Sequence, residues 1–352
     1  MIKPLSLFFC IVYLLFQASN CSACDEQIDR HLNVRIITDE AEAVLAILAK
    51  QKTQRRVGAA DWQQLFSTEG YVRLQKREAS LKRPFDNDQF KTFVLSDQLA
   101  ARAGSLAETL ERWRHADVNG AARRSLAYLP ANAQITAKIY PVIKPQTNSF
   151  VFEVQSDPAI FLYLDPEVSA DQFENTLAHE LHHIGYSSSC GAANSESKDP
   201  PNVRNVVGWI SAFGEGFAML AAAGGPDIDP HKFSKPEDRA RWHRDMANFN
   251  QDLKKFELFF INILEGKLDE QQRQQAGYAF FGVQGPWYTV GWKMAVLIEE
   301  TFGRARLIDC ICDHRQLLAT YNQAAVQYNR TARDPLALWS PTLLGAISSS
   351  SR

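Results

Sequence analysis

The sequence has no excess of charge of either sign. Its 38 lysines and arginines are balanced by 40 aspartates and glutamates, which gives 352 residues a formal net charge of -2. Nucleic acids and anionic membranes attract proteins through surplus positive charge, so we expect no nucleic-acid partner. The one basic run, Arg239 to Arg244, is interrupted by other residues and flanked by acidic ones, which is typical of a solvated helix face.

Internal repeats are also missing, and so is any strong compositional bias. The chain is 45% hydrophobic and 22% charged, which is the composition of an ordinary globular protein with a sizeable core. These absences exclude a repeat protein, a fibrous protein and a largely disordered chain. Beyond the N-terminus, no second segment resembles a membrane anchor or a targeting signal.

The first 23 residues have the layout of a secretory signal peptide, with Lys3, an apolar run from Leu5 to Phe16, and small or polar residues up to Ala23. A spanning helix needs roughly 20 apolar residues, more than this run supplies. We therefore expect export to the periplasm or the medium. Cleavage after Ala23 would expose Cys24, as in a bacterial lipoprotein, although Cys21 stands where leucine is usual. A lipid anchor through Cys24 is the alternative, and the one expected route to a membrane.

Cysteines are few. Removal of the signal would leave four of the six, namely Cys24, Cys190, Cys310 and Cys312. In an oxidising compartment these can pair in three ways, and the sequence does not choose among them. A zinc-thiolate site at Cys310 and Cys312 is a further alternative, but no second cysteine pair accompanies this C-x-C spacing.

The pattern predicts a mostly helical α+β chain. After the signal, we expect one domain over residues 131–347, preceded by an N-terminal helical region over residues 24–130 and followed by a disordered tail over residues 348–352. The domain begins with three short β-branched and aromatic strands, followed by a helix capped by Ser169 and a serine-rich loop from Ser187 to about Asn202. Further helices are expected over Asn205–Ala222, Pro236–Leu264 and from Pro286 to about Tyr328; the strands are Ile135–Ile143, Ser149–Val154 and Ile160–Leu164.

The helix after Ser169 contains His179-Glu180-Leu181-His182-His183. Side chains four residues apart project from one helix face, so His179 and His183 can bind one metal ion, with Glu180 beside them as a general base. The apolar residues of this helix, Phe173, Leu177, Leu181 and Ile184, cluster on another side, so the histidines are not part of the core stripe. His182 is expected to support the ligands from behind or to lie at the surface.

A zinc hydrolase usually has three protein ligands and an open fourth position. The best third candidate is Glu215, which lies 32 positions after His183, opposite an apolar stripe. The residues around it are small (Gly208, Ser211, Ala218 and Ala222), which would let the histidine helix come close. The alternative interpretation of Glu215 is an exposed surface glutamate.

The motif followed by Glu215-Gly216-Phe217-Ala218 resembles the gluzincin metallopeptidases, although the spacing is longer here. The stretch from Ile135 to about Ala325 is also similar to exported bacterial zinc-dependent peptidases of unknown function. The resemblance implies a zincin-like catalytic domain over residues 131–347, one zinc ion per chain, and a peptide or protein substrate. It also implies that Glu180 is the base that activates a zinc-bound water.

Two further features follow from the resemblance. A donor must hold the developing oxyanion, and Tyr288 is the candidate, ahead of His243; a packed or capping tyrosine is the alternative. The strand Ile160–Leu164 would border the cleft, where an extended peptide could pair with its edge, unless it is a buried central strand. The expected function is peptide-bond hydrolysis; the alternatives are a zinc amide or ester hydrolase and a non-catalytic zinc-binding envelope protein.

Overall fold

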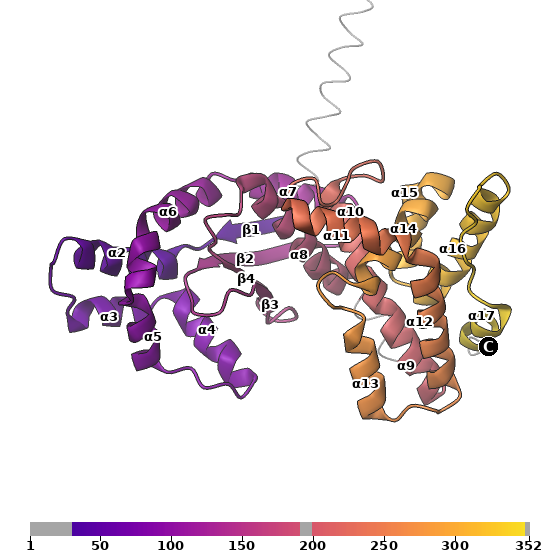
Figure 1. The fold of residues 1–352 in the computed structure, drawn as a ribbon, viewed down its shortest axis with the longest axis horizontal. Coiled ribbons are helices and arrows are strands. Elements are labelled where there is room, and N and C mark those ends of the chain that lie inside the picture. The colour runs from indigo at the N-terminus through magenta and orange to yellow at the C-terminus, as the bar shows by residue number, and fades with distance from the viewer. Residues whose placement is uncertain (1–29, 191–198, 349–352) are drawn as a thin grey trace, which may run out of the picture.

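The computed structural model describes residues 30–190 and 199–348. The expected signal, Cys24 and all but Ser348 of the expected tail therefore lie outside the described residues. The fold is α+β and mostly helical, with one small sheet that precedes a long helix (Figure 1).

The sheet has four strands in the order β1-β2-β4-β3. The pairs β1-β2 and β2-β4 are parallel, whereas β3 runs antiparallel to β4. Three of these strands were predicted, and the missed one, β1, is a short edge strand from the N-terminal region. The strands are β1 (Leu32–Ile36), β2 (Ile135–Val142), β3 (Phe150–Phe152) and β4 (Ala159–Tyr163).

The sheet is buried on both faces along β4 and the second half of β2, whereas β1 has exposed side chains. Side chains alternate along β2, so Ile139 enters the main core while Tyr140 joins a smaller cluster with Leu74 of α4 (Glu69–Ser80) on the other face. The main core continues from the N-terminal helices into the C-terminal ones. The N-terminal helices are α2 (Asp39–Lys52), α3 (Ala59–Phe66), α4 (Glu69–Ser80), α5 (Asn87–Val94), α6 (Asp97–Arg114) and α7 (Val118–Leu126).

Helix α8 (Ala170–Cys190) follows the sheet and packs against β2 and α7. Its expected cap is confirmed, since the Ser169 Oγ accepts a hydrogen bond from the Gln172 N–H at 3.1 Å. The predicted loop from Ser187 to about Asn202 was wrong at both ends, since α8 continues to Cys190 and the next helix begins at Pro201, while residues 191–198 lie outside the described residues. The hydroxyls of Ser188 and Ser189 donate to the Gly185 carbonyl one turn earlier, which lets the serines continue the helix to Cys190.

Helix α8 ends in a disulfide between Cys190 and Cys312. This bond joins the last turn of α8 to the turn between α15 (Arg304–Ile311) and α16 (His314–Asn329). It removes Cys312 from any zinc-thiolate site, and Cys310 is a buried free thiol.

After α8, residues 201–223 form a nearly continuous helical segment made of α9 (Pro201–Ile210), a single 3-10 turn (Ser211–Phe213) and α10 (Gly214–Ala223). The segment is long and apolar enough to cross a membrane by length and composition, although no such segment stood out in the sequence. Much of it is buried, and α10 packs between α8 and α14 (Pro286–Phe302), as expected of a core helix.

The remaining helices form the right-hand part of Figure 1. The helix expected over Pro236–Leu264 is interrupted at Asn248. The helix expected from Pro286 to about Tyr328 is interrupted at Gly303, whose φ of 84° suits glycine. Helix α13 was not predicted. These helices are α11 (Pro236–Ala247), α12 (Phe249–Leu264), α13 (Glu270–Ala279), α14 (Pro286–Phe302), α15, α16 and α17 (Pro341–Ser348).

Helices α10 and α14 touch through their backbones at Gly216. A Cβ atom added there would lie 1.9 Å from the Trp292 nitrogen, whereas one added at Gly214 would meet nothing within 4 Å. Gly216→Ala must therefore separate the two helices, and we expect a loss of roughly 1–3 kcal/mol or more in the free energy of unfolding. Gly214→Ala is the matched control and should not lower the melting temperature. Equal thermal unfolding of the two variants would contradict this packing.

Candidate metal site and active site

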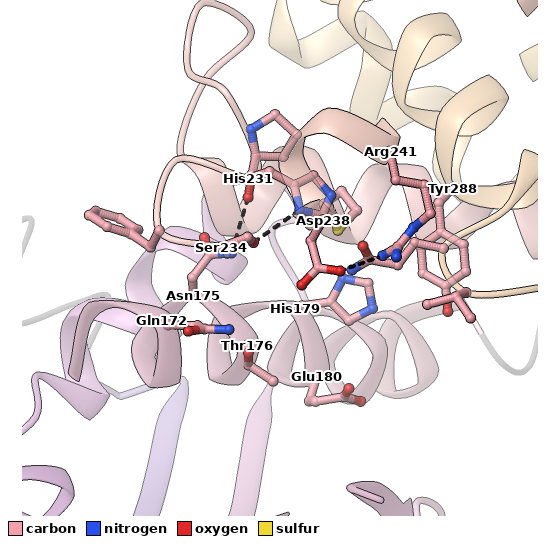
Figure 2. A pocket seen from close by; sticks show the side chains of 15 residues that line it. Gln172, Asn175, Thr176, His179, Glu180, His231, Ser234, Asp238, Arg241 and Tyr288 are labelled. Atoms are coloured by element: carbon pink, nitrogen blue, oxygen red, sulfur yellow. Dashed lines mark hydrogen bonds and ion pairs between the residues drawn. The ribbon is translucent and has the colours of Figure 1, made fainter. Parts of the chain in front are cut away.

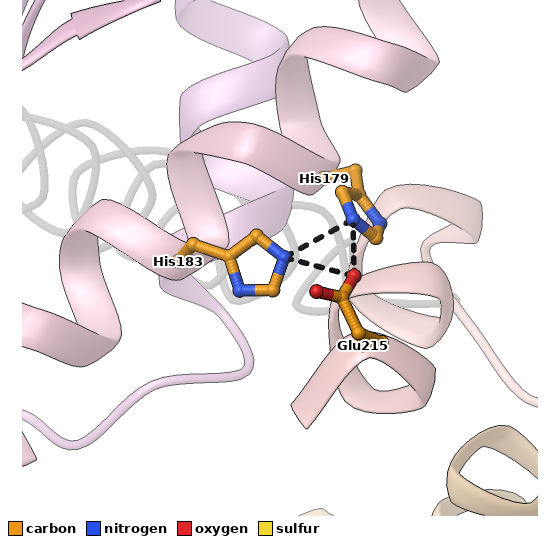
Figure 3. Close-up of side chains that lie close together, drawn as sticks. All are labelled: His179, His183 and Glu215. Carbon is orange, nitrogen blue, oxygen red and sulfur yellow. Dashed lines mark hydrogen bonds and ion pairs between the residues drawn. The ribbon is translucent and has the colours of Figure 1, made fainter. Parts of the chain in front are cut away.

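Three side chains from two helices converge at one point (Figure 3). The His179 Nε2 lies 3.1 Å from the Glu215 Oε2, and the His183 Nε2 lies 3.1 Å from the His179 Nε2 and 3.3 Å from the same carboxylate oxygen. The two histidines project from successive turns of α8, and Glu215 comes from the first turn of α10. The sequence prediction that these residues lie together is confirmed, and Glu215 is not an isolated surface glutamate.

The spacing of the three atoms fits a tetrahedral zinc ion. Zinc binds imidazole nitrogen and carboxylate oxygen at about 2.0–2.2 Å, which places neighbouring ligand atoms of a tetrahedron about 3.3 Å apart. The observed separations of 3.1 to 3.3 Å are close to that value. Two imidazoles and one carboxylate form a donor set that zinc hydrolases use. The chemistry and the spacing of these residues therefore fit a zinc ion.

The charges of the three side chains are strongly coupled. Burial alone would raise the pKa of the Glu215 carboxyl, but the nearby His183 and His179 outweigh it and hold that pKa well below its usual range. For His183 the signs are reversed. Burial lowers the pKa of its imidazole, but the Glu215 carboxylate outweighs this effect and raises the pKa to about 9. Glu215 is therefore ionised at neutral pH and can bind a cation.

The opposite side of α8 holds the helix in place. Phe173, Leu177, Leu181 and Ile184 are all buried, as their position on the helix predicted. The small-residue face around Glu215 is confirmed only in part. Ala218 and Ala222 are buried, but Gly208 is exposed and Ser211 half-buried, because the turn at Ser211–Phe213 interrupts the helix.

His182 is not a surface residue. Its side chain is 1% exposed, and burial together with the neighbouring His183 and His179 lowers its pKa to about 3. It is therefore a neutral imidazole beside the ligands, on the wall of a small second cavity that His183 and Glu215 also line.

A cavity of about 370 Å³ opens over His179 and Glu180 (Figure 2). Tyr288, near the start of α14, also lines it, and its ring stacks on that of His179 with 6.2 Å between centroids. Burial, and then the Glu215 and Glu180 carboxylates, raise the pKa of the Tyr288 phenol above its ordinary value. By contrast, His243 does not line the cavity; it is exposed, near Asp229.

The substrate edge predicted at Ile160–Leu164 is not available. Strand β4 lies inside the sheet, paired with β2 on one side and with β3 on the other. The Tyr163 N–H, at the end of β4, is also occupied, because it donates to the Oγ of Ser149, the residue before β3, at 3.1 Å. The alternative of a buried central strand is therefore correct, and β3 is the free edge on that side of the sheet.

Sequence reasoning missed the wall opposite α8. It is formed by the segment between α10 and α11 and by the first turns of α11, which bring His231, Asp238 and Arg241 to the cavity. The interpretation of Arg239 to Arg244 as a solvated face was thus wrong for Arg241. The one available signal was the Asp238–Arg241 spacing of three residues, which forms an ion pair of 2.8 Å on the helix.

Comparison with known families agrees with this chemistry. A family model described as "Putative zinc dependent peptidase (DUF5700)" matches residues 62–330, which is more than half of the chain. No curated protein and no solved structure matches the sequence. The matched segment includes both histidines, Glu180, Glu215, Arg241 and Tyr288.

If the three converging side chains bind zinc, removal of any one should empty the site. We expect His183→Ala and Glu215→Ala to lose most of the metal, because two remaining ligands hold zinc weakly. Zinc per chain is measured by elemental analysis after dialysis against a weak chelator. His243→Ala, at an exposed histidine away from the cavity, is the control and should keep its zinc. Full zinc retention by both ligand variants would show that the ion binds elsewhere.

Proposed function

The chain belongs to the DUF5700 family of zinc-dependent peptidases, and from this premise we propose that it hydrolyses peptide bonds with one zinc ion held by His179, His183 and Glu215. The observation that carries the proposal is the convergence of these three side chains beside a cavity that Glu180 also lines. A structural zinc site normally has four protein ligands, whereas a catalytic one keeps a position open. Within residues 30–190 and 199–348, the group at this point has three.

Zinc bound here would act as a Lewis acid that polarises the scissile carbonyl and acidifies water. Glu180 is not among the three donors and stands next to His179 on α8, so its carboxylate is free for proton transfer. It would take the proton from the attacking water and pass it to the leaving amine. The substrate occupies the cavity over α8, between this base and Tyr288.

Tyr288 supports the other half of the reaction. A phenol is protonated at neutral pH at its ordinary pKa of about 10, and the raised pKa of Tyr288 makes loss of that proton still less favourable, so it is a hydrogen-bond donor. A donor fixed in a partly buried site stabilises the negative charge that develops on the carbonyl oxygen. The Tyr288 ring lies nearly parallel to that of the proposed ligand His179, on the same cavity as Glu180, which supports this role.

We further propose that the protein works outside the cytoplasm. The signal-like residues 1–23 lie outside the described residues, as does Cys24 with its alternative lipid anchor. The Cys190–Cys312 disulfide supports export, since such bonds persist mainly in oxidising compartments.

Replacement of the base separates metal binding from hydrolysis. We expect Glu180→Gln to keep one zinc per chain and to lose about 10²- to 10⁴-fold in cleavage rate, because the amide cannot accept the proton. Mass spectrometry of a diverse peptide library, with small amides and esters added, measures the loss and maps the bonds cut. Glu237→Gln, at an exposed glutamate of α11, is the matched control. A fully loaded wild type that cuts no peptide, or cuts only the small esters, would contradict a peptidase.

The phenol of Tyr288 can be tested by removing one atom. Tyr288→Phe should lower kcat about 10²- to 10³-fold with little change in KM, since the lost hydrogen bond forms mainly in the transition state. Tyr278→Phe, at an exposed tyrosine of α13, serves as the control in the same steady-state assay. A raised KM with an unchanged kcat would instead assign Tyr288 to ground-state substrate binding.

A further inference from the structure

The cavity over the metal ligands has an asymmetric charge distribution. Its α8 side contributes the metal ligand His179 and the base Glu180, together with the uncharged Gln172, Asn175 and Thr176. The facing wall contributes an ion pair, Asp238 and Arg241, three residues apart on α11. Among the described residues that line this cavity, Arg241 is the one lysine or arginine. Apart from the zinc ion proposed at His179, an anionic group of a substrate that enters the cavity therefore has one fixed cation available to it among the described residues.

The guanidinium of Arg241 is oriented by one ion pair and keeps N–H donors that can bind a ligand. Its Nη2 donates to the Asp238 Oδ1 at 2.8 Å, and the side chain remains 30% exposed. Asp238 is its one ion-pair partner in the described part of the chain. A guanidinium has five N–H donors in a planar fork, so one bond to Asp238 fixes its direction and leaves donors for a second carboxylate. Figure 2 shows the ion pair extending from α11 toward the side of the cavity that holds His179 and Tyr288.

Helix α11 and the segment before it, which carry this ion pair, are fixed by contacts with their surroundings. Helix α11 is anchored by Trp242, which is 3% exposed and packs on His231 with 4.8 Å between ring centroids. His231 is itself 2% exposed and lies 3.0 Å from the Ser234 Oγ through its Nδ1. The segment before α11 is tied to α8 through Asn175, whose Nδ2 donates to the Pro230 carbonyl at 3.4 Å. A charged group on such a wall loses little freedom when it binds a ligand.

We propose that Arg241 binds a carboxylate of the substrate peptide, so that the enzyme selects peptides with a negative charge close to the scissile bond. The carboxylate is either the C-terminus of the peptide or an acidic side chain, because both present the same two oxygens to the fork. This inference rests on the proposed peptidase function, since it assigns the substrate that the same cavity accepts. The volume of about 370 Å³ lies within the usual range of ligand sites, about 300–1,000 Å³.

The opposite assignment, an ammonium group bound by Asp238, fits the contacts less well. One oxygen of that carboxylate is already occupied by Arg241, which leaves a single oxygen for a substrate cation. The same cation would lie close to the guanidinium and be repelled by it. A carboxylate on Arg241 is repelled by Asp238 in turn, but it can gain two parallel charge-assisted hydrogen bonds.

The test measures binding, separately from cleavage. Zinc-loaded Glu180→Gln is titrated with fluorescent peptides in three matched pairs: a free C-terminus against its amide, an internal aspartate against asparagine, and a free N-terminus against its acetylated form. We expect one carboxylate form to bind about 10- to 100-fold more tightly than its amide. The pair that shows the preference identifies the source of the carboxylate.

Substitution assigns the preference to one residue. In the same background, Arg241→Ala should abolish the discrimination, and Arg241→Gln, which keeps most of the side-chain stem, should do the same. Arg244→Ala removes an exposed arginine from the same helix and should preserve the discrimination between carboxylate and amide peptides. Zinc content and thermal unfolding confirm that each variant is folded.

Three binding results would each overturn the assignment: equal affinity for the carboxylate and amide forms, discrimination that survives in Arg241→Ala, or a preference for a free N-terminal amine that Asp238→Asn removes. Failure of the peptidase function has a different signature, because wild type would then cut no peptide whether or not Arg241 discriminates in binding. Cleavage of a library without any carboxylate preference would refute only the role of Arg241.

Discussion

The close packing of α10 between α8 and α14 is the constraint on which the site depends. Glu215 can reach the two histidines only if α10 lies against α8, and Tyr288 can reach His179 only if α14 lies against α10. Gly216 allows the second contact, because its missing side chain lets the backbones of α10 and α14 touch. Three helices distant in sequence therefore place a carboxylate, two imidazoles and a phenol within a few ångströms of one another.

The rest of the fold fixes this stack from its two sides. The sheet and α7 support the apolar side of α8, so the histidines are forced to face α10. The Cys190–Cys312 disulfide attaches the end of α8 to the C-terminal helices. The segment between α10 and α11 then returns over α8 and completes the cavity. Because the donor atoms already have nearly tetrahedral spacing, zinc binding needs little reorganisation, which favours tight binding and a constant geometry.

Local patterns predicted the parts of this site that lie within one helix. His179 and His183 are four residues apart, and the apolar residues of α8 repeat with the helical period, so both the ligand pair and its orientation followed from spacing. Glu215 was also found, although from a small-residue face of which only Ala218 and Ala222 are buried. The length of α8 was underestimated because serines usually end helices, whereas here their hydroxyls bond the preceding turn.

Features that depend on tertiary arrangement could not be predicted in the same way. The order of strands decides whether β4 is an edge, and no pattern within Ala159–Tyr163 records it. In the sequence, Arg241 cannot be distinguished from a surface arginine. It lines the cavity only because the chain after α10 packs over α8. The pairing of Cys190 with Cys312 likewise depends on where α8 and α16 meet.

The central claim is that His179, His183 and Glu215 hold a catalytic zinc ion. A crystal structure of the zinc-loaded protein, with anomalous diffraction recorded on both sides of the zinc edge, tests it most directly. The expected result is one anomalous peak per chain within about 2.0–2.2 Å of the two imidazole Nε2 atoms and a Glu215 oxygen, with no fourth protein ligand. A peak at another place, or a fourth side chain bound to the ion, would contradict a catalytic site.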